Sequence, residues 1–233
     1  NIPVDVVTRD KDLSKYALVV APMLYMVGDA LAQGLKAYVE GGGKLVSTYI
    51  SGIADETDLV HEGSFHPVLR EIFGMTVTET DTLYPSDRNR LVGYGGKEYE
   101  AMDYCALIAN HGAEVLAAYG GDFYQGTPAV TKNKVGEGQA YFIGARTGGD
   151  FLRDFYGELL AGLDVNAPPI GAGPGVSVQT RASSNATYYF IMNFTEEPRT
   201  FTLLQDMVDI MTGQTIAKGE HTLPVYGARI CKR

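Results

Sequence analysis

The chain is poor in several residue types, and each shortage excludes a class of protein. Its 233 residues include no tryptophan, two cysteines and four histidines. The 19 basic residues are outnumbered by 28 acidic ones, which gives a net charge of -9. An acidic surface disfavours nucleic acids and anionic membranes as partners. No apolar run approaches the roughly 20 residues of a membrane span, and no basic-then-apolar signal sequence opens the chain.

The few residues that could hold a metal or a cofactor are not arranged to do so. Cys105 and Cys231 lie far apart and match no zinc or redox spacing. They predict buried free thiols, which are typical of a cytoplasmic protein. The pairs Gly120-Gly121 and Gly148-Gly149 fit neither G-x-G-x-x-G nor a Walker pattern, and therefore predict turns. We expect no metal and no cofactor.

The first two thirds of the chain begin with a strand, a helix and a second strand. Residues 17–22 are a continuous apolar run, which is typical of a parallel strand covered on both faces. Apolar residues then recur at helical spacing until Gly41-Gly42-Gly43, and residues 44–50 form the next strand. This order predicts a right-handed crossover and a parallel sheet. Further on, the pattern predicts a hairpin over 129–144 and an amphipathic helix over 150–161.

The composition changes near residue 167. Residues 167–175 (APPIGAGPG) are rich in proline and glycine, which predicts a linker. Beyond them no helical period remains, and short strands alternate with turns. We therefore expect an α/β domain over 1–166, a linker over 167–175 and a small antiparallel all-β domain over 176–233.

Three stretches carry a family resemblance. Residues 45–75 (LVSTYISGIADETDLVHEGSFHPVLREIFGM) leave a buried strand at Ser51-Gly52, pass through an acidic loop and enter a short amphipathic helix. Together with residues 16–26 and 119–144, this stretch resembles the middle domain of the family 42 glycoside hydrolases, which are multidomain bacterial β-galactosidases. Asn193-Phe194-Thr195 looks like the characteristic stretch of their C-terminal β domain. The resemblance covers nearly the whole chain.

The resemblance implies a fold. The middle domain of the family is flavodoxin-like and is similar to class I glutamine amidotransferases, with a parallel sheet and helices on both faces. Residues 1–7 read as the strand that follows a first strand and helix, so we expect those two elements to be missing from the domain over 1–166. The family also carries its catalytic carboxylates on an N-terminal (β/α)8 barrel. Such a barrel needs about 250 residues by itself, so there is no room for it here.

The resemblance also implies a function without catalysis. The middle domain would mediate formation of a homotrimer and orient the missing catalytic barrels, and no catalytic residue is carried over. The parent enzyme would hydrolyse terminal β-galactosides with retention. We therefore expect this chain to be the non-catalytic portion of a bacterial, cytoplasmic β-galactosidase.

The acidic loop is the candidate interface with a partner. Its spacing fits no calcium-binding loop, so a solvated or interface loop is favoured over a metal site. The resemblance favours the interface, because this loop is its most distinctive feature. By their position in or beside the loop, the interface candidates are Asp55, Asp58, His61, Phe65 and Arg70.

A degenerate amidotransferase-like hydrolase is one alternative. Ser51 would be its nucleophile, with a histidine as base. A nucleophile elbow needs glycine two residues before and two residues after the serine, whereas positions 49 and 53 hold tyrosine and isoleucine. We therefore expect Ser51 to hydrogen-bond the backbone. The candidate bases would be His61, His66 and His111.

Sugar chemistry is the other alternative. Glu79 and Asp81, two residues apart on a strand, would be separated much like the two carboxyls of a retaining glycosidase. They would project from the same side, however, and are expected to be exposed or interface charges. The 15 tyrosines would suit a carbohydrate-binding module or an interface. Because tryptophan is absent, the interface is favoured.

Overall fold

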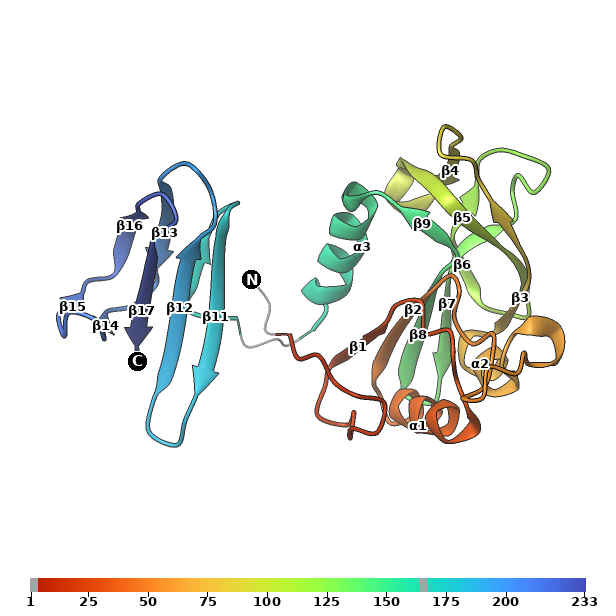
Figure 1. Ribbon diagram of the computed structural model, residues 1–233, viewed down its shortest axis with the longest axis horizontal. Coiled ribbons are helices and arrows are strands. Elements are labelled where there is room, and N and C mark those ends of the chain that lie inside the picture. The colour runs from red at the N-terminus through yellow and green to blue at the C-terminus, as the bar shows by residue number, and fades with distance from the viewer. Residues whose placement is uncertain (1–3, 164–166) are drawn as a thin grey trace. The chain divides into compact units, whose positions relative to one another are not determined.

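The computed structural model describes residues 4–163 and 167–233. These residues divide into two compact units (Figure 1), each described by itself. The first, over residues 8–163, is called the α/β unit, and the second, over residues 4–7 and 167–233, is called the β unit. Residues 4–7 were expected to belong to a strand, but they form none, and Val4 and Val6 are exposed.

The α/β unit contains a mixed sheet. Strands β1 (Leu18–Ala21), β2 (Lys44–Thr48) and β8 (Gly138–Ile143) are parallel neighbours. The strand order is β1-β2-β8-β7-β6-β4-β5-β3, and β9 pairs with β5. The antiparallel strands are β3 (Met75–Thr82), β4 (Asn89–Val92), β5 (Glu98–Asn110), β6 (Glu114–Tyr119), β7 (Pro128–Val135) and β9 (Ala145–Thr147).

The expected parallel sheet is therefore confirmed for β1, β2 and β8 only, and the sheet as a whole is mixed. Parallel neighbours need a crossover of a dozen or more residues, whereas antiparallel neighbours can be joined by a tight hairpin. β7 and β8 are joined by Gly136 and Glu137, as the predicted hairpin requires. Only three residues separate β5 from β6. Such short connections leave the parallel arrangement to β1, β2 and β8.

Helices cover both faces of the parallel strands, as expected. Alternate residues of a strand point to opposite faces, so Leu45 and Phe142 belong to one core cluster, and Val46 and Ile143 to the other. α1 and α2 pack in the first cluster, and α3 packs in the second (Figure 1). The helices are α1 (Asp29–Glu40), α2 (Pro67–Phe73) and α3 (Gly149–Ala161), with short 3-10 turns η1 (Glu62–Ser64) and η2 (Tyr94–Gly96).

Many tyrosines are core residues rather than interface residues. Tyr94 and Tyr99 pack around Phe151 of α3, with ring centroids 5.5 and 5.2 Å from its ring. Tyr119 is fully buried and donates its hydroxyl hydrogen to the carbonyl oxygen of Ala106. A tyrosine can be buried in this way because its hydroxyl finds a partner inside the protein.

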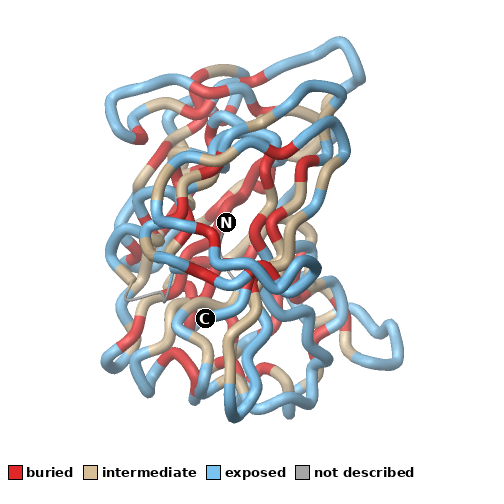
Figure 2. The backbone as a smooth tube through the Cα atoms, turned by 90° about the vertical axis from the view of Figure 1, so that its left-hand side faces the viewer, coloured by how far each residue is buried: buried red, intermediate tan, exposed pale blue. Residues whose placement is uncertain are grey.

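The β unit is all antiparallel. One sheet has the order β10-β13-β16 and the other has the order β11-β12-β17-β14-β15. Its buried residues lie within the strands and its exposed residues lie mainly in the loops, and Figure 2 colours the backbone by this burial. The strands are β10 (Ile170–Ala172), β11 (Val176–Ala182), β12 (Thr187–Asn193), β13 (Arg199–Leu203), β14 (Met207–Asp209), β15 (Thr215–Ile216), β16 (Gly219–Leu223) and β17 (Ala228–Lys232).

The segment expected to be a linker contains a strand of the β unit. Strand β10 pairs with β13, and Ile170 is buried in the same core as Ile191 and Leu203. Burial of this isoleucine outweighs the flexible composition of the surrounding prolines and glycines. Composition alone did not show that Ile170 has a core to enter.

Replacing Gly138 with alanine should destabilise the α/β unit by about 3 kcal/mol through overpacking. A Cβ at this position would lie 2.0 Å from the carbonyl oxygen of Val39 and 2.4 Å from that of Gly43, and backbone atoms cannot easily move aside. Urea denaturation would measure the change. Gly157→Ala is the control, because a Cβ there meets open space in α3. It should stabilise the unit by about 0.5–1 kcal/mol, and equal stability of the two variants would contradict the packing argument.

Candidate functional site

The candidate site lies where the parallel strands β1 and β2 end. The carboxyl ends of parallel strands meet at one edge of a sheet, where α/β proteins commonly bind their ligands. Two loops follow these strands, residues 22–28 and residues 49–61, and are called the edge loops. They are joined by backbone hydrogen bonds from Gly52 to Leu24 (2.8 Å), from Ile53 to Tyr25 (3.0 Å) and from Val27 to Ala54 (2.7 Å). The edge loops therefore form one preformed surface.

Ser51 helps to join the edge loops. It is buried, and its Oγ accepts a hydrogen bond from the backbone N–H of Leu24 at 2.9 Å. This confirms the expected backbone contact, although the partner lies in the other edge loop. In the described part of the chain, each candidate base is bonded elsewhere: His61 to Val27, His66 to Val68 and His111 to Thr76. The geometry therefore supports no serine–histidine pair.

The carboxylate of Asp55 organises its own loop. Its Oδ1 accepts hydrogen bonds from the N–H and hydroxyl of Thr57, at 2.8 and 2.7 Å, and from the N–H of Leu59, at 3.0 Å. These bonds lower the pKa of Asp55, and the bond from the Thr57 hydroxyl contributes most. Asp58 lies at positive φ (66°) and interacts with the Tyr25 hydroxyl, whose pKa it raises. Across residues 4–163 and 167–233, no group of His, Cys, Asp or Glu is placed to hold a metal ion.

His61 and His66 pack edge to face, with ring centroids 4.6 Å apart. His61 Nε2 lies 2.9 Å from the carbonyl oxygen of Val27, to which it can donate a hydrogen bond. His66 is buried, its Nδ1 accepts the N–H of Val68, and it thereby caps the N-terminus of α2. Its Nε2 lies 3.2 Å from Asp29 Oδ1. Burial lowers the pKa of His66, the neighbouring His61 and Arg70 lower it further, and Asp29 opposes them.

Phe65 and Arg70 follow the second edge loop in the chain and bond or pack against the protein beside it. Phe65 is fully buried and packs edge to face against Phe142 of β8, with centroids 6.0 Å apart. Arg70 Nε donates to the carbonyl oxygen of Phe65 at 3.1 Å, and a terminal nitrogen donates to that of Glu62. The structure thus brings all five interface candidates together, but Phe65 lies in the core and Asp55 is bonded within its loop.

The sequence reasoning missed the apolar part of this surface. Five apolar residues of the edge loops are exposed, and together they are called the edge patch. Bridges place Met26 beside Ala54, and Ala54 beside Val60. The apolar segments 23–26 (MLYM) and 59–60 (LV) were the available signal in the sequence, but their exposure depends on the tertiary fold. The residues of the edge patch are Met23, Tyr25, Met26, Leu59 and Val60.

Glu79 and Asp81 lie in different surroundings. They pair with Leu107 and Cys105 of β5 without a register shift between them, so they share one face of the strand, as expected. Asp81 is half-buried and accepts a 2.7 Å hydrogen bond from the Tyr124 hydroxyl, whereas Glu79 is exposed. Asp81 therefore belongs to a buried polar contact, which corrects the expectation that both residues are exposed or interface charges.

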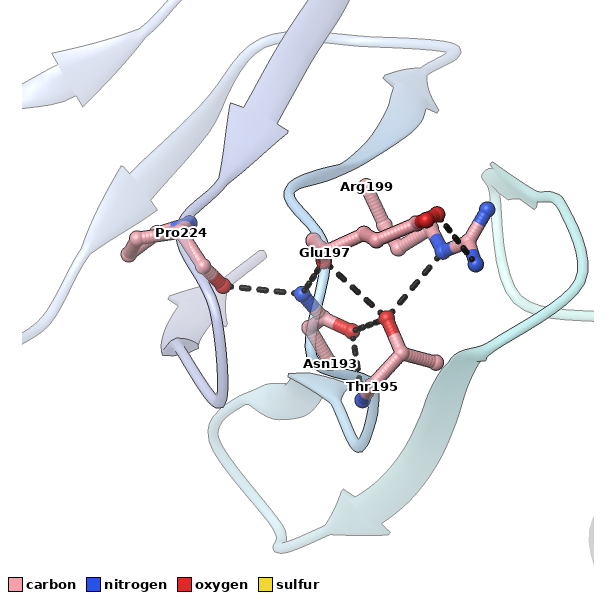
Figure 3. A network of polar contacts seen from close by, with 5 residues as sticks. All are labelled: Asn193, Thr195, Glu197, Arg199 and Pro224. Atoms are coloured by element: carbon pink, nitrogen blue, oxygen red, sulfur yellow. Dashed lines mark hydrogen bonds and ion pairs between the residues drawn. The ribbon is translucent and has the colours of Figure 1, made fainter.

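The stretch Asn193-Phe194-Thr195 forms a polar network in the β unit (Figure 3). Asn193 is buried, and its Nδ2 donates to the carbonyl oxygens of Glu197 (2.7 Å) and Pro224 (2.8 Å). Its Oδ1 accepts from the N–H (2.9 Å) and the hydroxyl (2.8 Å) of Thr195. The amide thus makes all four of the hydrogen bonds available to it. The bond to Pro224 joins the turn that contains Thr195 and Glu197 to the segment that follows β16.

Two family models match the chain. The model described as "Beta-galactosidase trimerisation domain" matches residues 1–166, and the model described as "Beta-galactosidase C-terminal domain" matches residues 175–233. The second match begins within the β unit, just before β11. The first includes both edge loops. Among the described residues, no helix is long and apolar enough to cross a membrane.

Curated relatives and solved structures give the same assignment. The chain is 47% identical to β-galactosidase GanA of Bacillus subtilis over 231 residues, which are 99% of this chain and 34% of that protein. A catalytic mutant of Gan42B, a GH42 β-galactosidase from G. stearothermophilus, superposes with a TM-score of 0.94 at 48% identity, over 100% of this chain and 34% of that one. A β-galactosidase from Bacillus circulans sp. alkalophilus superposes with a TM-score of 0.92 at 36% identity, over 99% and 35%. The chain spans about a third of these proteins.

Acid should destabilise the α/β unit through His66. The pKa of His66 is lower in the folded protein than in the unfolded chain, so the unfolded chain takes up the proton first. The contribution of neutral His66 to stability is therefore present above about pH 6.5 and is lost as the pH falls through the folded-state pKa. One extra proton on the unfolded chain gives a slope of at most about 1.4 kcal/mol per pH unit. Urea denaturation between pH 7.5 and 5 would measure it.

His66→Asn should reduce that slope, because asparagine can still accept the Val68 N–H as an N-cap but does not titrate. His111→Asn is the matched control, since His111 is an exposed histidine that bonds Thr76. An unchanged slope in His66→Asn would contradict the assignment to His66.

Asn193→Asp should destabilise the β unit by about 2–3 kcal/mol. The new carboxylate oxygen would face the carbonyl oxygens of Glu197 and Pro224 without a proton to donate. Asn185→Asp, in an exposed turn, makes the same chemical change as a control and should have little effect. Hydrogen exchange of the β-unit amides would report the difference, and equal protection in both variants would contradict the role of the network.

Proposed function

We infer that this chain acts as a scaffold in assembly, because it belongs to the GH42 β-galactosidase family and comprises the trimerisation and C-terminal domains of that family. We propose that residues 1–166 mediate formation of a homotrimer and thereby orient the catalytic barrels of a longer parent protein. The observation that carries this proposal is the match of the trimerisation-domain model to residues 1–166. The parent protein, on this proposal, hydrolyses terminal β-galactosides with retention.

The use of the polar groups supports a scaffold. Ser51 accepts from the Leu24 N–H, Asp55 from Thr57, and Asp81 from the Tyr124 hydroxyl. Each of these three groups thus has a partner within the protein. Rigid loops of this kind are suited to presenting a surface to another protein.

The domain limits of the proposal follow the sequence, with one refinement. We propose a trimerisation domain over 1–166 and a C-terminal β domain that begins at β10 rather than at 176, because β10 pairs with β13. Both cysteines are buried and free. Together with the bacterial relatives, these free thiols support a cytoplasmic location for the parent protein.

Solution mass tests the proposal directly. Size exclusion with light scattering, over a range of concentrations, should give three times the 25.2 kDa of the chain. The chain alone should not hydrolyse a chromogenic β-galactoside above the buffer rate. A strict monomer at high concentration would contradict trimerisation by these two domains, and turnover that purifies with the chain would contradict a scaffold without catalysis.

A further inference from the structure

A polar hollow of about 580 Å³ lies between two loops of the α/β unit. The first loop, over residues 83–88, joins β3 to β4, and the second, over residues 120–127, joins β6 to β7. Asp87 and Arg88 line the hollow from the first loop, and Asp122 lines it from the second. This space, called the loop hollow, has the volume of a pocket for a small ligand, which is typically ~300–1,000 Å³.

Close backbone contacts join the two loops. Asn89, at the start of β4, also lines the hollow; it is buried, and its Nδ2 donates to the carbonyl oxygen of Gly121 at 3.0 Å. The N–H of Gly120 donates to the carbonyl oxygen of Arg90 at 2.8 Å, and a terminal nitrogen of Arg90 donates to that of Gly120 at 3.0 Å. A Cβ at Gly120 would lie 2.9 Å from the side chain of Val92, so glycine permits this approach. The loop hollow is therefore preformed, and a preformed site loses little entropy on binding.

The charges of the lining favour a neutral ligand. Arg88 bonds two backbone carbonyl oxygens of its own loop through one terminal nitrogen, which leaves its other N–H groups without a protein partner among the described residues. Arg90 is paired with Glu98 at 3.0 Å. Asp87 and Asp122 each use one carboxylate oxygen, for a neighbouring hydroxyl and a neighbouring backbone N–H. An anion would meet the carboxylates and a cation would meet Arg88, whereas a hydroxyl group can donate to the first and accept from the second.

Two exposed aromatic residues belong to the same loops. Tyr84 and Phe123 are each 76% exposed, and they directly follow the lining residues Leu83 and Asp122. The Phe123 ring packs at 90° against buried Tyr124, with ring centroids 4.9 Å apart. The electron-rich face of an aromatic ring attracts the polarised C–H groups on the face of a sugar ring. Polar groups of both charges beside exposed aromatic rings thus match the hydroxyl and C–H surfaces of a sugar.

We propose that the loop hollow binds a neutral oligosaccharide. Sugar hydroxyls donate to Asp87 and Asp122 and accept from Arg88, and the C–H face of one sugar ring stacks on Phe123. This binding role goes beyond assembly and needs no second copy of the chain. The choice of a galactoside as the sugar rests on the proposed function, in which the parent protein hydrolyses β-galactosides. The loop hollow then holds substrate on the parent protein without cleaving it.

Two variants remove one contact each. Arg88→Ala deletes the guanidinium, and Phe123→Ala deletes the exposed ring; neither side chain is buried, so the fold should persist. The matched controls lie in the β unit. Arg181→Ala changes an exposed arginine that also bonds a backbone carbonyl oxygen of its own strand, and Phe194→Ala changes a ring that is 67% exposed.

Saturation-transfer difference NMR with lactose as the ligand would measure the dissociation constant. Lactose should receive saturation from the unmodified chain. The dissociation constant should rise at least about tenfold in Arg88→Ala and in Phe123→Ala, because a charged hydrogen bond or the stacked ring is lost. Both controls should bind lactose as the unmodified chain does, and an excess of sodium sulfate should not displace the sugar.

Three results would overturn the inference. No saturation transfer to lactose would show that the loop hollow holds no sugar, equal dissociation constants in all variants would place the sugar elsewhere, and displacement by sulfate would show a site for anions. Light scattering on the same samples separates the inference from the proposed function. Trimers that bind no lactose would refute the sugar site alone, whereas a monomer that binds lactose through Arg88 and Phe123 would refute the trimer alone.

Discussion

Burial of β2 and β8 on both faces is the constraint on which the α/β unit depends. Leu45 and Phe142 must be covered on one side of the sheet and Val46 and Ile143 on the other, so helices are needed on both. α1, which covers one face, also makes the crossover that keeps β1 and β2 parallel. The carboxyl ends of these strands therefore meet at one edge. The edge loops, and with them the candidate interface, are placed by this packing.

The polar side chains in and beside the edge loops mainly bond backbone groups. Ser51 joins the two loops, Asp55 closes a turn and His66 caps α2. Groups that a sequence search selects for possible chemistry are thus used to order the backbone. What remains exposed in the edge loops is a set of apolar side chains, Leu59 and Val60 among them, together with carboxylates such as Asp58. In the β unit too, the Asn193 amide orders the backbone: three of its hydrogen bonds lie within its own turn, to Thr195 and Glu197, and the fourth reaches Pro224.

Similarity over 99% of this chain and 34% of its relative identifies the domains and the family. It does not say which surface of the chain meets which partner. The exposure of Leu59, next to backbone that Asp55 holds in place, comes from the structure.

The sequence by itself determined the local elements and the family. Apolar periodicity predicted β1, α1, β2, α3 and the hairpin of β7 and β8, because these segments carry their pattern within a few residues. It also predicted the buried thiols of Cys105 and Cys231. Only the tertiary structure decided the mixed sheet, the entry of β10 into the β unit and the burial of Phe65. These depend on contacts between residues far apart in the chain, such as Ile170 with Leu203 or Phe65 with Phe142. No local pattern records which distant side chain will cover a given residue.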